Sequence, residues 1–342
     1  MIKIRFAAIE DKPAIISFLK KHWSEKSILV RSGKIFDFQY IFEGKCGFVL
    51  AIDDETGEIY GIKGYFPFNS LPEPDVAAAL AIVLQGVRPM LGMEIERFLE
   101  KETHSRWLCS TGLNPNTSVR VYQLFKKQYV VDKLRHYYRI ADRNEYRVAV
   151  VDSKRILPVE ETGCELVPLS TIDEYKTIFD ATAYIHQRPY KDEQYIEHRY
   201  FKHPVYHYQL LGIREPHAAK VSAVIIARGI DCNDTKVLRI VDYLGDRSAI
   251  GRAGSAVGQL LEQEGYEYAD FYCYGFGHEH MTAGGFVLRD ENDPNVIPNY
   301  FEPFERRNVD VWFFSTGAEN AAVCKADGDQ DRPNILPEGF EE

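Results

Sequence analysis

A short pattern that occurs twice constrains this 342-residue chain more than any other feature. Arg88 is followed four positions later by Gly92, and Arg247 is followed in the same way by Gly251, at an offset of 159 residues. Each copy comes after an apolar, strand-like run and opens a segment of helical periodicity. A fixed offset between similar segments is typical of repeated structural units. The sequence therefore predicts two similar units, one after the other.

Both units are expected to begin with a strand followed by a helix. Their first strands start at Ile2 and Cys164, an offset of 162 that agrees with the repeated pattern. The elements predicted for the first unit are strands over 2–7, 47–52, 59–66, 76–87, 107–113, 135–141 and 147–151, and helices over 11–21, 90–101 and 117–127. The predicted organisation is a first domain over 1–152, a linker over 153–163, a second domain over 164–334 and a tail over 335–342.

Composition excludes several classes of protein. With 45% hydrophobic and 27% charged residues, the chain has the balance of a globular protein. No apolar run approaches the roughly 18 residues of a membrane span, and no secretory signal is recognisable. The net charge of -10 argues against binding nucleic acid, which needs clustered Lys and Arg. Six scattered cysteines without a CxxC pattern indicate free thiols. We expect a cytoplasmic protein that binds neither nucleic acid nor membrane.

The turn around the first copy has the features of an anion-binding helix start. A helix N-terminus presents N–H groups without partners, and its dipole favours negative charge. The segment resembles the Arg/Gln-x-x-Gly-x-Gly/Ala turn of the GCN5-related N-acetyltransferase (GNAT) superfamily, although Gly92 follows Arg88 by four positions rather than three. The resemblance implies that acyl-CoA is the co-substrate, and that its pyrophosphate is held by Arg88 and by the amides of Leu91, Gly92 and Met93.

A second segment resembles the GNAT pattern Asn-x-Asn-Ala-x-x-Leu-Tyr-x-x-x-Gly-Phe. Here Asn114 and Asn116 are expected to cap a helix, with Tyr122 on its inner face. The resemblance implies that the matching Asn contacts the pantetheine arm and that the Tyr122 hydroxyl protonates the leaving thiolate. The chain has one extra residue before Tyr122 and lacks the Gly-Phe afterwards. The alternative is a core tyrosine with its hydroxyl at the surface.

The second unit keeps the Arg-x-x-x-Gly segment but lacks the segment with Asn-x-Asn and Tyr. No Asn-x-Asn and Tyr segment follows its next strand, predicted over 267–275. We therefore expect one cofactor site, in the first unit. The second unit instead carries many Tyr, Arg and His residues over 184–207, whose rings and guanidinium groups are able to hold a base and a diphosphate. The candidate substrate-binding residues are Tyr184, Arg188, Tyr195, Arg199 and Tyr200. An aromatic helix packed on its sheet is an equal alternative.

Further segments are similar to the second domains of tandem GNAT proteins from bacterial surface-polysaccharide gene clusters. They are residues 199–204, 283–286, 297–304 and 327–334. This group includes dTDP-amino-sugar N-acyltransferases that use 3-hydroxybutyryl-CoA. The resemblance implies an α/β (α+β) fold of two tandem GNAT domains, each with a mixed, mostly antiparallel sheet flanked by helices. It also implies transfer of an acetyl or 3-hydroxybutyryl group to a nucleotide-linked sugar such as dTDP-3-amino-3,6-dideoxyhexose, for O-antigen or another surface polysaccharide.

The sequence leaves the general base open. The predicted strand over 79–85 has no carboxylate, so the candidates are Asp242 in the corresponding second strand, His203, and a relay of water. Asp242 is equally able to pair with an arginine. No metal site is expected, because no carboxylate or cysteine completes a set with the histidines.

A different class of function also fits the sequence: a catalytically inactive tandem module that binds a nucleotide sugar or a protein partner. Such a module has no need to keep Tyr122 and the Gly92 turn together. We expect either a monomer or a homodimer.

Overall fold

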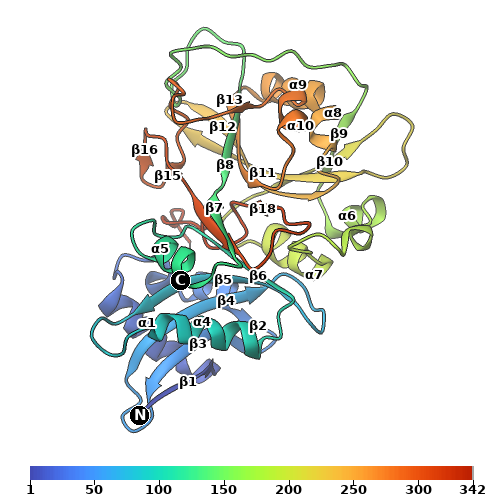
Figure 1. Ribbon diagram of the computed structural model, residues 1–342. Coiled ribbons are helices and arrows are strands. Elements are labelled where there is room, and N and C mark those ends of the chain that lie inside the picture. Colours follow the sequence, from blue (N-terminus) through green and yellow to red (C-terminus); the bar gives the residue numbers. More distant parts are fainter. Residues whose placement is uncertain (341–342) are drawn as a thin grey trace.

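The computed structural model describes residues 1–340, which form two mixed sheets, one below the other in Figure 1. The lower sheet consists of β1 (Ile2–Ala7), β3 (Lys45–Asp53), β4 (Ile59–Pro67), β5 (Asp75–Val83), β6 (Trp107–Thr111), β17 (Trp312–Ser315) and β7 (Val130–Lys133) in that order, with β2 (Ile41–Phe42) beside β3. The helices of this half are η1 (Ile9–Asp11), α1 (Lys12–His22), α2 (Ile28–Arg31), α3 (Gly33–Tyr40), α4 (Leu91–Glu102) and α5 (Ser118–Phe125).

The upper sheet follows the same plan. It consists of β9 (Glu165–Leu169), β10 (Gln209–Arg214), β11 (Ala223–Cys232), β12 (Thr235–Gly245), β13 (Tyr266–Tyr274), β8 (Arg135–Ile140) and β14 (Val287–Leu288) in that order, with β18 (Val323–Cys324) beside β13. Its helices are α6 (Ile172–Ile178), η2 (Ala181–Tyr184), α7 (Glu193–Ile196), the π-helical η3 (Glu197–Phe201), α8 (Ala249–Arg252), α9 (Gly254–Glu264) and α10 (His278–Ala283). A small separate sheet pairs β15 (Tyr300–Phe301) with β16 (Phe304–Glu305).

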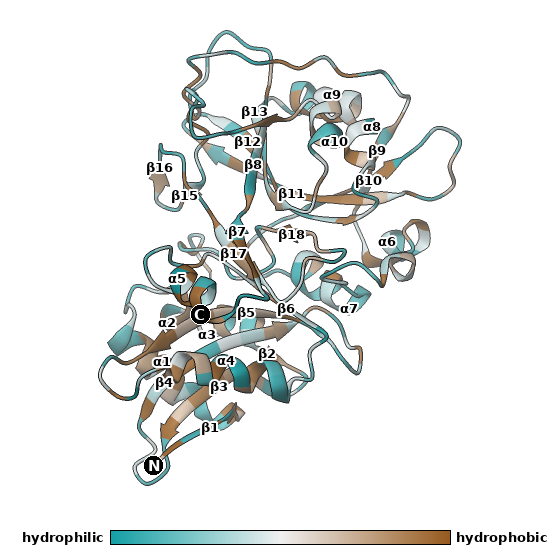
Figure 2. Cartoon of the chain, in the orientation of Figure 1, coloured by the Kyte–Doolittle hydropathy of each residue, from teal (hydrophilic) through white to brown (hydrophobic). Residues whose placement is uncertain are grey.

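The apolar residues of β3 explain why helices cover both faces of the lower sheet. Phe48 and Leu50 pack into the core with α1 to α3, whereas Val49 and Ala51 pack with α4. Neighbouring strand residues point to opposite faces, so a continuous apolar run requires cover on each side. Figure 2 shows the central strands of this sheet as largely hydrophobic. The predicted fold class, an α/β arrangement of mostly antiparallel sheets flanked by helices, is confirmed.

The two halves exchange one strand each. β8, predicted to close the first unit, instead pairs with β13 in the upper sheet, and β17 from the end of the chain lies between β6 and β7 in the lower sheet. The predicted place of β8 in the first unit was wrong. Only Leu134 separates β7 from β8, so the chain has no room for the reversal that a hairpin between these two strands needs. The strand predicted over 147–151 is also absent from the described residues, apart from a single bridge between Val150 and Val296.

Each sheet contains one parallel pair of neighbouring strands that soon separates. β5 pairs with β6 only from Asp75 to Ala77, and β12 pairs with β13 only as far as Ile240. In both halves the strand that leaves the pair also has a register shift against its antiparallel neighbour, near Leu80 in β5 and near Val241 in β12. An extra residue in one strand bends it locally. The same separation of two parallel strands, which we call the split, therefore occurs in both sheets.

The remaining global predictions concern the thiols and the membrane. All six cysteines are free, and only Cys232 is partly exposed. In the part of the chain that the structure describes, no helix is long and apolar enough to cross a membrane. Residues 341 and 342 of the predicted tail lie outside the described residues.

Candidate functional site

The turn after β5 leads directly into α4. Met90 has a left-handed φ of 61° and immediately precedes Leu91, the first residue of the helix. The Leu91 amide donates to the carbonyl of Arg88 at 3.4 Å, and the Met93 amide donates to the carbonyl of Met90 at 2.9 Å. Within residues 1–340, the Gly92 amide has no backbone acceptor. Of the three amides predicted to hold an anion, this is the one that is free to do so.

Arg88 lies beside this helix start. Its guanidinium contacts the carboxylate of Glu94 in the first turn of α4, and both side chains are more than a third exposed. An ion pair at such exposure contributes little stability. The guanidinium is therefore able to turn from Glu94 towards an anion at the amide of Gly92.

Asn114 and Asn116 occupy the exposed turn before α5. The Asn114 side-chain oxygen accepts from the Asn116 amide at 2.9 Å, which stabilises the turn. The residue that precedes α5 is Thr117, whose side chain makes no capping hydrogen bond. The predicted capping of α5 by the two asparagines was therefore wrong, because the extra residue moves the helix start away from them.

Tyr122 lies on the inner face of α5 and is only 8% exposed. Its ring packs against Phe314 of β17, with 4.5 Å between ring centroids. Its hydroxyl donates to Glu96 Oε2 at 3.2 Å and lies 3.3 Å from Lys63 Nζ, and Lys63 also contacts Glu96. One residue from each of β4, α4 and α5 thus meets at the split between β5 and β6. We call Lys63, Glu96 and Tyr122 the inner triad.

Burial decides the charge states of Tyr122 and Lys63. It raises the pKa of the Tyr122 phenol above its usual value, so the hydroxyl keeps its proton at neutral pH. Burial, with a smaller contribution from Lys126, lowers the pKa of Lys63 to about 7. Lys63 is therefore able to gain and lose a proton near neutral pH. Its titration and the retained phenol proton suit proton transfer.

The equivalent turn in the second half is arranged differently. The Asp246 carboxylate accepts from the Ser248 amide at 2.9 Å and from the Ser248 hydroxyl at 2.7 Å, and Arg252 pairs with it. Arg247, the counterpart of Arg88, donates to the carbonyls of Gly275 and Ala321. An acidic side chain of the protein itself therefore lies at the start of α8, where an anion would meet a like charge.

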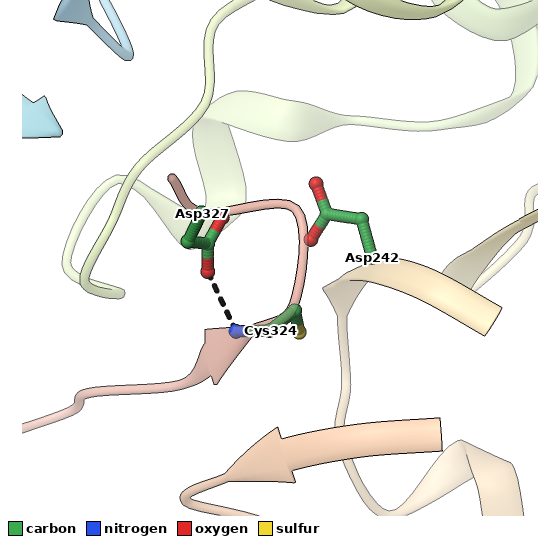
Figure 3. Close-up of side chains that lie close together, drawn as sticks. All are labelled: Asp242, Cys324 and Asp327. Carbon is green, nitrogen blue, oxygen red and sulfur yellow. Dashed lines mark hydrogen bonds between the residues drawn. The ribbon is translucent and has the colours of Figure 1, made fainter. Parts of the chain in front are cut away.

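Asp242 belongs to a buried cluster at the second split (Figure 3). Lys191 Nζ lies 2.5 Å from Asp242 Oδ1 and 2.6 Å from Asp327 Oδ1, and the Tyr200 hydroxyl also donates to Asp242. Asp242, Asp327 and Cys324 are close enough to share a metal ion, but the Lys191 ammonium already lies against both carboxylates. Burial raises the pKa of Asp327 to about 7, although Lys191 acts against this. The cluster joins three distant segments of the chain.

A cavity of about 850 Å³ lies between the lower sheet and the segment that contains α7 and η3. Its walls include Phe38, Phe66 and Tyr195, and its polar lining includes Arg199 and Asn69. Arg199 is 7% exposed and donates to the carbonyl of Asp331 at 2.7 Å, while its Nε has no partner in the part of the chain that the structure describes. The hydroxyl of Tyr195 is also buried, with no partner among the described residues. Both groups would gain from an acceptor atom supplied by a ligand.

The structure brings together only some of the predicted substrate residues. Tyr195 and Arg199 line the cavity, whereas Tyr184 lines a separate hollow of about 640 Å³ beside Asp246. Arg188 donates to the carbonyls of Ile185 and Gln187, and Tyr200 is bound to Asp242. Neither of these two residues lines the cavity.

His203, one of the candidate bases, is 9% exposed. Its Nδ1 accepts the amides of Val205 at 3.1 Å and Tyr206 at 2.8 Å. Burial, supported by Arg199, lowers its pKa to about 3. The ring therefore stays neutral with its proton on Nε2, and the two amides occupy the lone pair of Nδ1, so His203 has no nitrogen free to accept a proton from the amine.

Sequence reasoning missed Lys63 and Glu96. Both carried a signal: Lys63 interrupts an apolar strand, and Glu96 falls on the same helical face as the buried Met93 and Leu99 of α4. A charged residue in an otherwise buried pattern is rarely found without a partner.

The comparisons with known proteins support the fold. The sequence matches no protein-family model and no curated protein. The structure is similar to a GCN5-related N-acetyltransferase from Anabaena variabilis, with a TM-score of 0.53, 12% identity, and coverage of 92% of this chain and 72% of that one. It is also similar to a probable N-acyltransferase of unknown function from Enterococcus faecalis, with a TM-score of 0.51, 10% identity and the same coverage. The chain therefore has a GNAT-type fold.

Proposed function

We propose that this protein is an acyl-CoA-dependent N-acyltransferase whose acyl-CoA binds at the turn between β5 and α4. The observation that carries the proposal is the difference between the two turns. In the second half, Asp246 fills the start of α8 with negative charge. In the first half, the free amide of Gly92 at the start of the 12-residue helix α4, with Arg88 nearby, suits a diphosphate. Two proteins of similar fold are described as N-acetyl- or N-acyltransferases.

The proposed chemistry uses Tyr122 as the general acid. The acceptor amine attacks the thioester carbonyl, the carbon–sulfur bond breaks, and the sulfur takes the proton of the Tyr122 hydroxyl. The raised pKa of Tyr122 keeps that proton available. The amine loses its own proton to Asp242, to His203 or to a relay of water, and the partners of the first two favour the relay.

The proposed acceptor is the amine of a nucleotide-linked sugar such as dTDP-3-amino-3,6-dideoxyhexose, which receives an acetyl or 3-hydroxybutyryl group for surface-polysaccharide synthesis. The cavity of about 850 Å³ has the size of a small-molecule site. Its aromatic walls suit a flat base, and Arg199 offers donors to a diphosphate. The cavity reaches Tyr65, whose partner in β5 is Ala78, next to the register shift. The acceptor and the cofactor would thus approach one point of the sheet from different sides.

The alternative, an inactive module that binds a nucleotide sugar or a protein, has one observation in its favour. The Tyr122 hydroxyl is buried and already bonded to Glu96, as expected of a structural tyrosine. The two functions differ in whether coenzyme A binds, so a binding experiment separates them.

Calorimetric titration with coenzyme A tests the proposal. A Cβ at Gly92 would lie 3.6 Å from Val83 Cγ2, an ordinary contact, so both alanine and aspartate fit this position. We expect one site per chain, retained in Gly92→Ala and weakened about 10- to 100-fold in Gly92→Asp, because the new carboxylate repels the diphosphate and competes for the helix start. Two equivalent sites, or equal affinity in both variants, would contradict the proposal.

A further inference from the structure

A second set of Lys, Glu and Tyr lies next to the inner triad. Lys126 Nζ is 2.9 Å from Glu100 Oε2 and 2.8 Å from the Tyr129 hydroxyl, which itself donates to Glu100 at 2.9 Å. We call Glu100, Lys126 and Tyr129 the outer triad. The rings of Tyr122 and Tyr129 are 6.0 Å apart. The two sets are therefore neighbours that meet through these rings.

The two triads differ in their access to water. The side chains of Lys63 and Glu96 are 5% and 1% exposed, whereas Glu100 is 37% exposed. Glu96 and Glu100 are four residues apart and so lie on one face of α4. The outer triad therefore lies at the solvent side of α4, and the inner triad lies buried beside it.

Stability alone is a poor explanation for the inner triad. A buried ion pair often contributes no more than apolar residues of the same volume. Glu96 Oε1 is, in addition, buried without a hydrogen-bond partner among residues 1–340, which costs free energy. These polar groups nevertheless meet at the split between β5 and β6, where the reacting groups are proposed to come together.

We propose that Lys63 and Glu96 are positioning residues that orient the Tyr122 hydroxyl and return a proton to it after each acyl transfer, an inference that rests on the proposed function. Glu96 Oε2 accepts the hydrogen bond of the Tyr122 hydroxyl, and Lys63 Nζ lies 3.3 Å from the hydroxyl oxygen. Lys126, Glu100 and Tyr129 are the other ionisable groups that face the triad.

Protons balance in this cycle. When the carbon–sulfur bond breaks, its electron pair goes to sulfur, and the Tyr122 proton moves to that sulfur. The phenolate then takes a proton from the Lys63 ammonium. Lys63 regains a proton from solvent, while the acceptor amine releases one proton as it becomes an amide. No net proton is consumed beyond the one transferred from amine to thiol.

The steady-state turnover number as a function of pH tests this role, because the proton returns to Tyr122 only after the acyl transfer, with acetyl-CoA and dTDP-3-amino-3,6-dideoxygalactose as the probes. Because Lys63 must be protonated to donate, the wild-type rate should fall as pH rises through about 7. Lys63→Arg keeps the positive charge beside Glu96 but does not release a proton in this range. We expect its rate to fall about 10-fold or more below neutral pH and to lose the decline above pH 7. Tyr129→Phe, the matched change in the outer triad, should keep the decline. A wild-type pH profile in Lys63→Arg would overturn the proposal.

A second measurement decides the question without turnover. Nuclear magnetic resonance of carbon-13-labelled lysine should show Lys63 titrating near pH 7, with a displaced midpoint in Glu96→Gln and Tyr122→Phe. Titration of Lys63 only in the ordinary range of lysine, near ~10.4, would contradict the proton return. If the single variants do not fold, the double variant Lys63→Met with Glu96→Leu is used instead, because it removes both charges together. If coenzyme A does not bind, the proposed function fails, whereas a normal Lys63 titration in a protein that binds coenzyme A rejects only this inference.

Discussion

The two splits in the sheets have the same geometry but differ in the residues that lie at them. At the first split, the inner triad comes entirely from the first half, from β4, α4 and α5. At the second split, Asp242 is held by Lys191 from the segment before α7 and lies beside Asp327 from near the end of the chain. The segment before α7 and the C-terminal loop thus close the second split, while the polar groups at the first come from β4 and from the two helices α4 and α5.

This difference indicates how one fold can divide its tasks between two copies. The helix after β6 buries Tyr122, but the helix after β13 buries Met281, which has no proton to give. The second half has also placed Asp246 where an anion would bind. We interpret the first half as the chemical half and the second as the half that supports the acceptor.

The largest expected effect comes from opening the closed split. Lys191→Met leaves Asp242 and Asp327 buried next to each other without their shared cation, so we expect a loss of about 3–5 kcal/mol in the free energy of unfolding. Urea denaturation measures this loss. Lys176→Met is the control, because Lys176 is 42% exposed and its pair with Glu193 should contribute less than about 1 kcal/mol. Similar losses in both variants would remove the distinction between the splits.

The helices after the two splits give the next test. Tyr122→Phe should lower the single-turnover rate about 100-fold and leave coenzyme A affinity nearly unchanged, since a proton is given only in the transition state. Met281→Leu, a change of similar volume in the matching helix, should leave the rate unchanged. Rapid-quench kinetics measures both. An undiminished rate in Tyr122→Phe would return this residue to a purely structural role.

A smaller effect concerns the pH dependence of stability that His203 of the second half produces. Neutral His203 accepts two amides through Nδ1, and its pKa is lowered from 6.5 to about 3, so the unfolded chain takes up a proton first as pH falls. Stability should therefore decline as pH drops below about 6.5. His203→Asn offers an uncharged acceptor, and we expect the wild type to lose about 2 kcal/mol relative to it between pH 7 and pH 5. Parallel stability curves from chemical denaturation would contradict this.

The smallest effect concerns the acceptor cavity. Arg199→Ala should raise the KM for the dTDP-amino sugar about 10-fold, because a charge-assisted contact worth about 1.5 kcal/mol is lost. Affinity for coenzyme A should not change. Arg214→Ala is the control, since Arg214 pairs with Glu165 far along the second sheet and does not line the cavity. Steady-state kinetics with the two substrates varied in turn measures both constants.

The sequence predicted elements that depend on local signals. The strand over Ile2–Ala7 and the hairpin of β3 and β4 lie where apolar alternation and a turn placed them. The sheet to which β8 belongs was not predictable in this way, because either sheet offered a partner strand and the choice depends on contacts distant in sequence. The same holds for the site: Tyr122 followed from a motif, but Lys63 and Glu96 acquire meaning only when β4 and α4 pack together.

The exchange of strands has a consequence for synthesis of the chain. β7 ends at Lys133, but β17, which fills the place beside it, begins at Trp312. While the ribosome adds the residues between them, the facing edges of β6 and β7 have no partner, and exposed strand edges invite pairing with other chains. Loop closure over such a separation is also slow. We therefore expect the nascent first half to require chaperone protection until translation is nearly complete, and the two halves to fold in a single cooperative step.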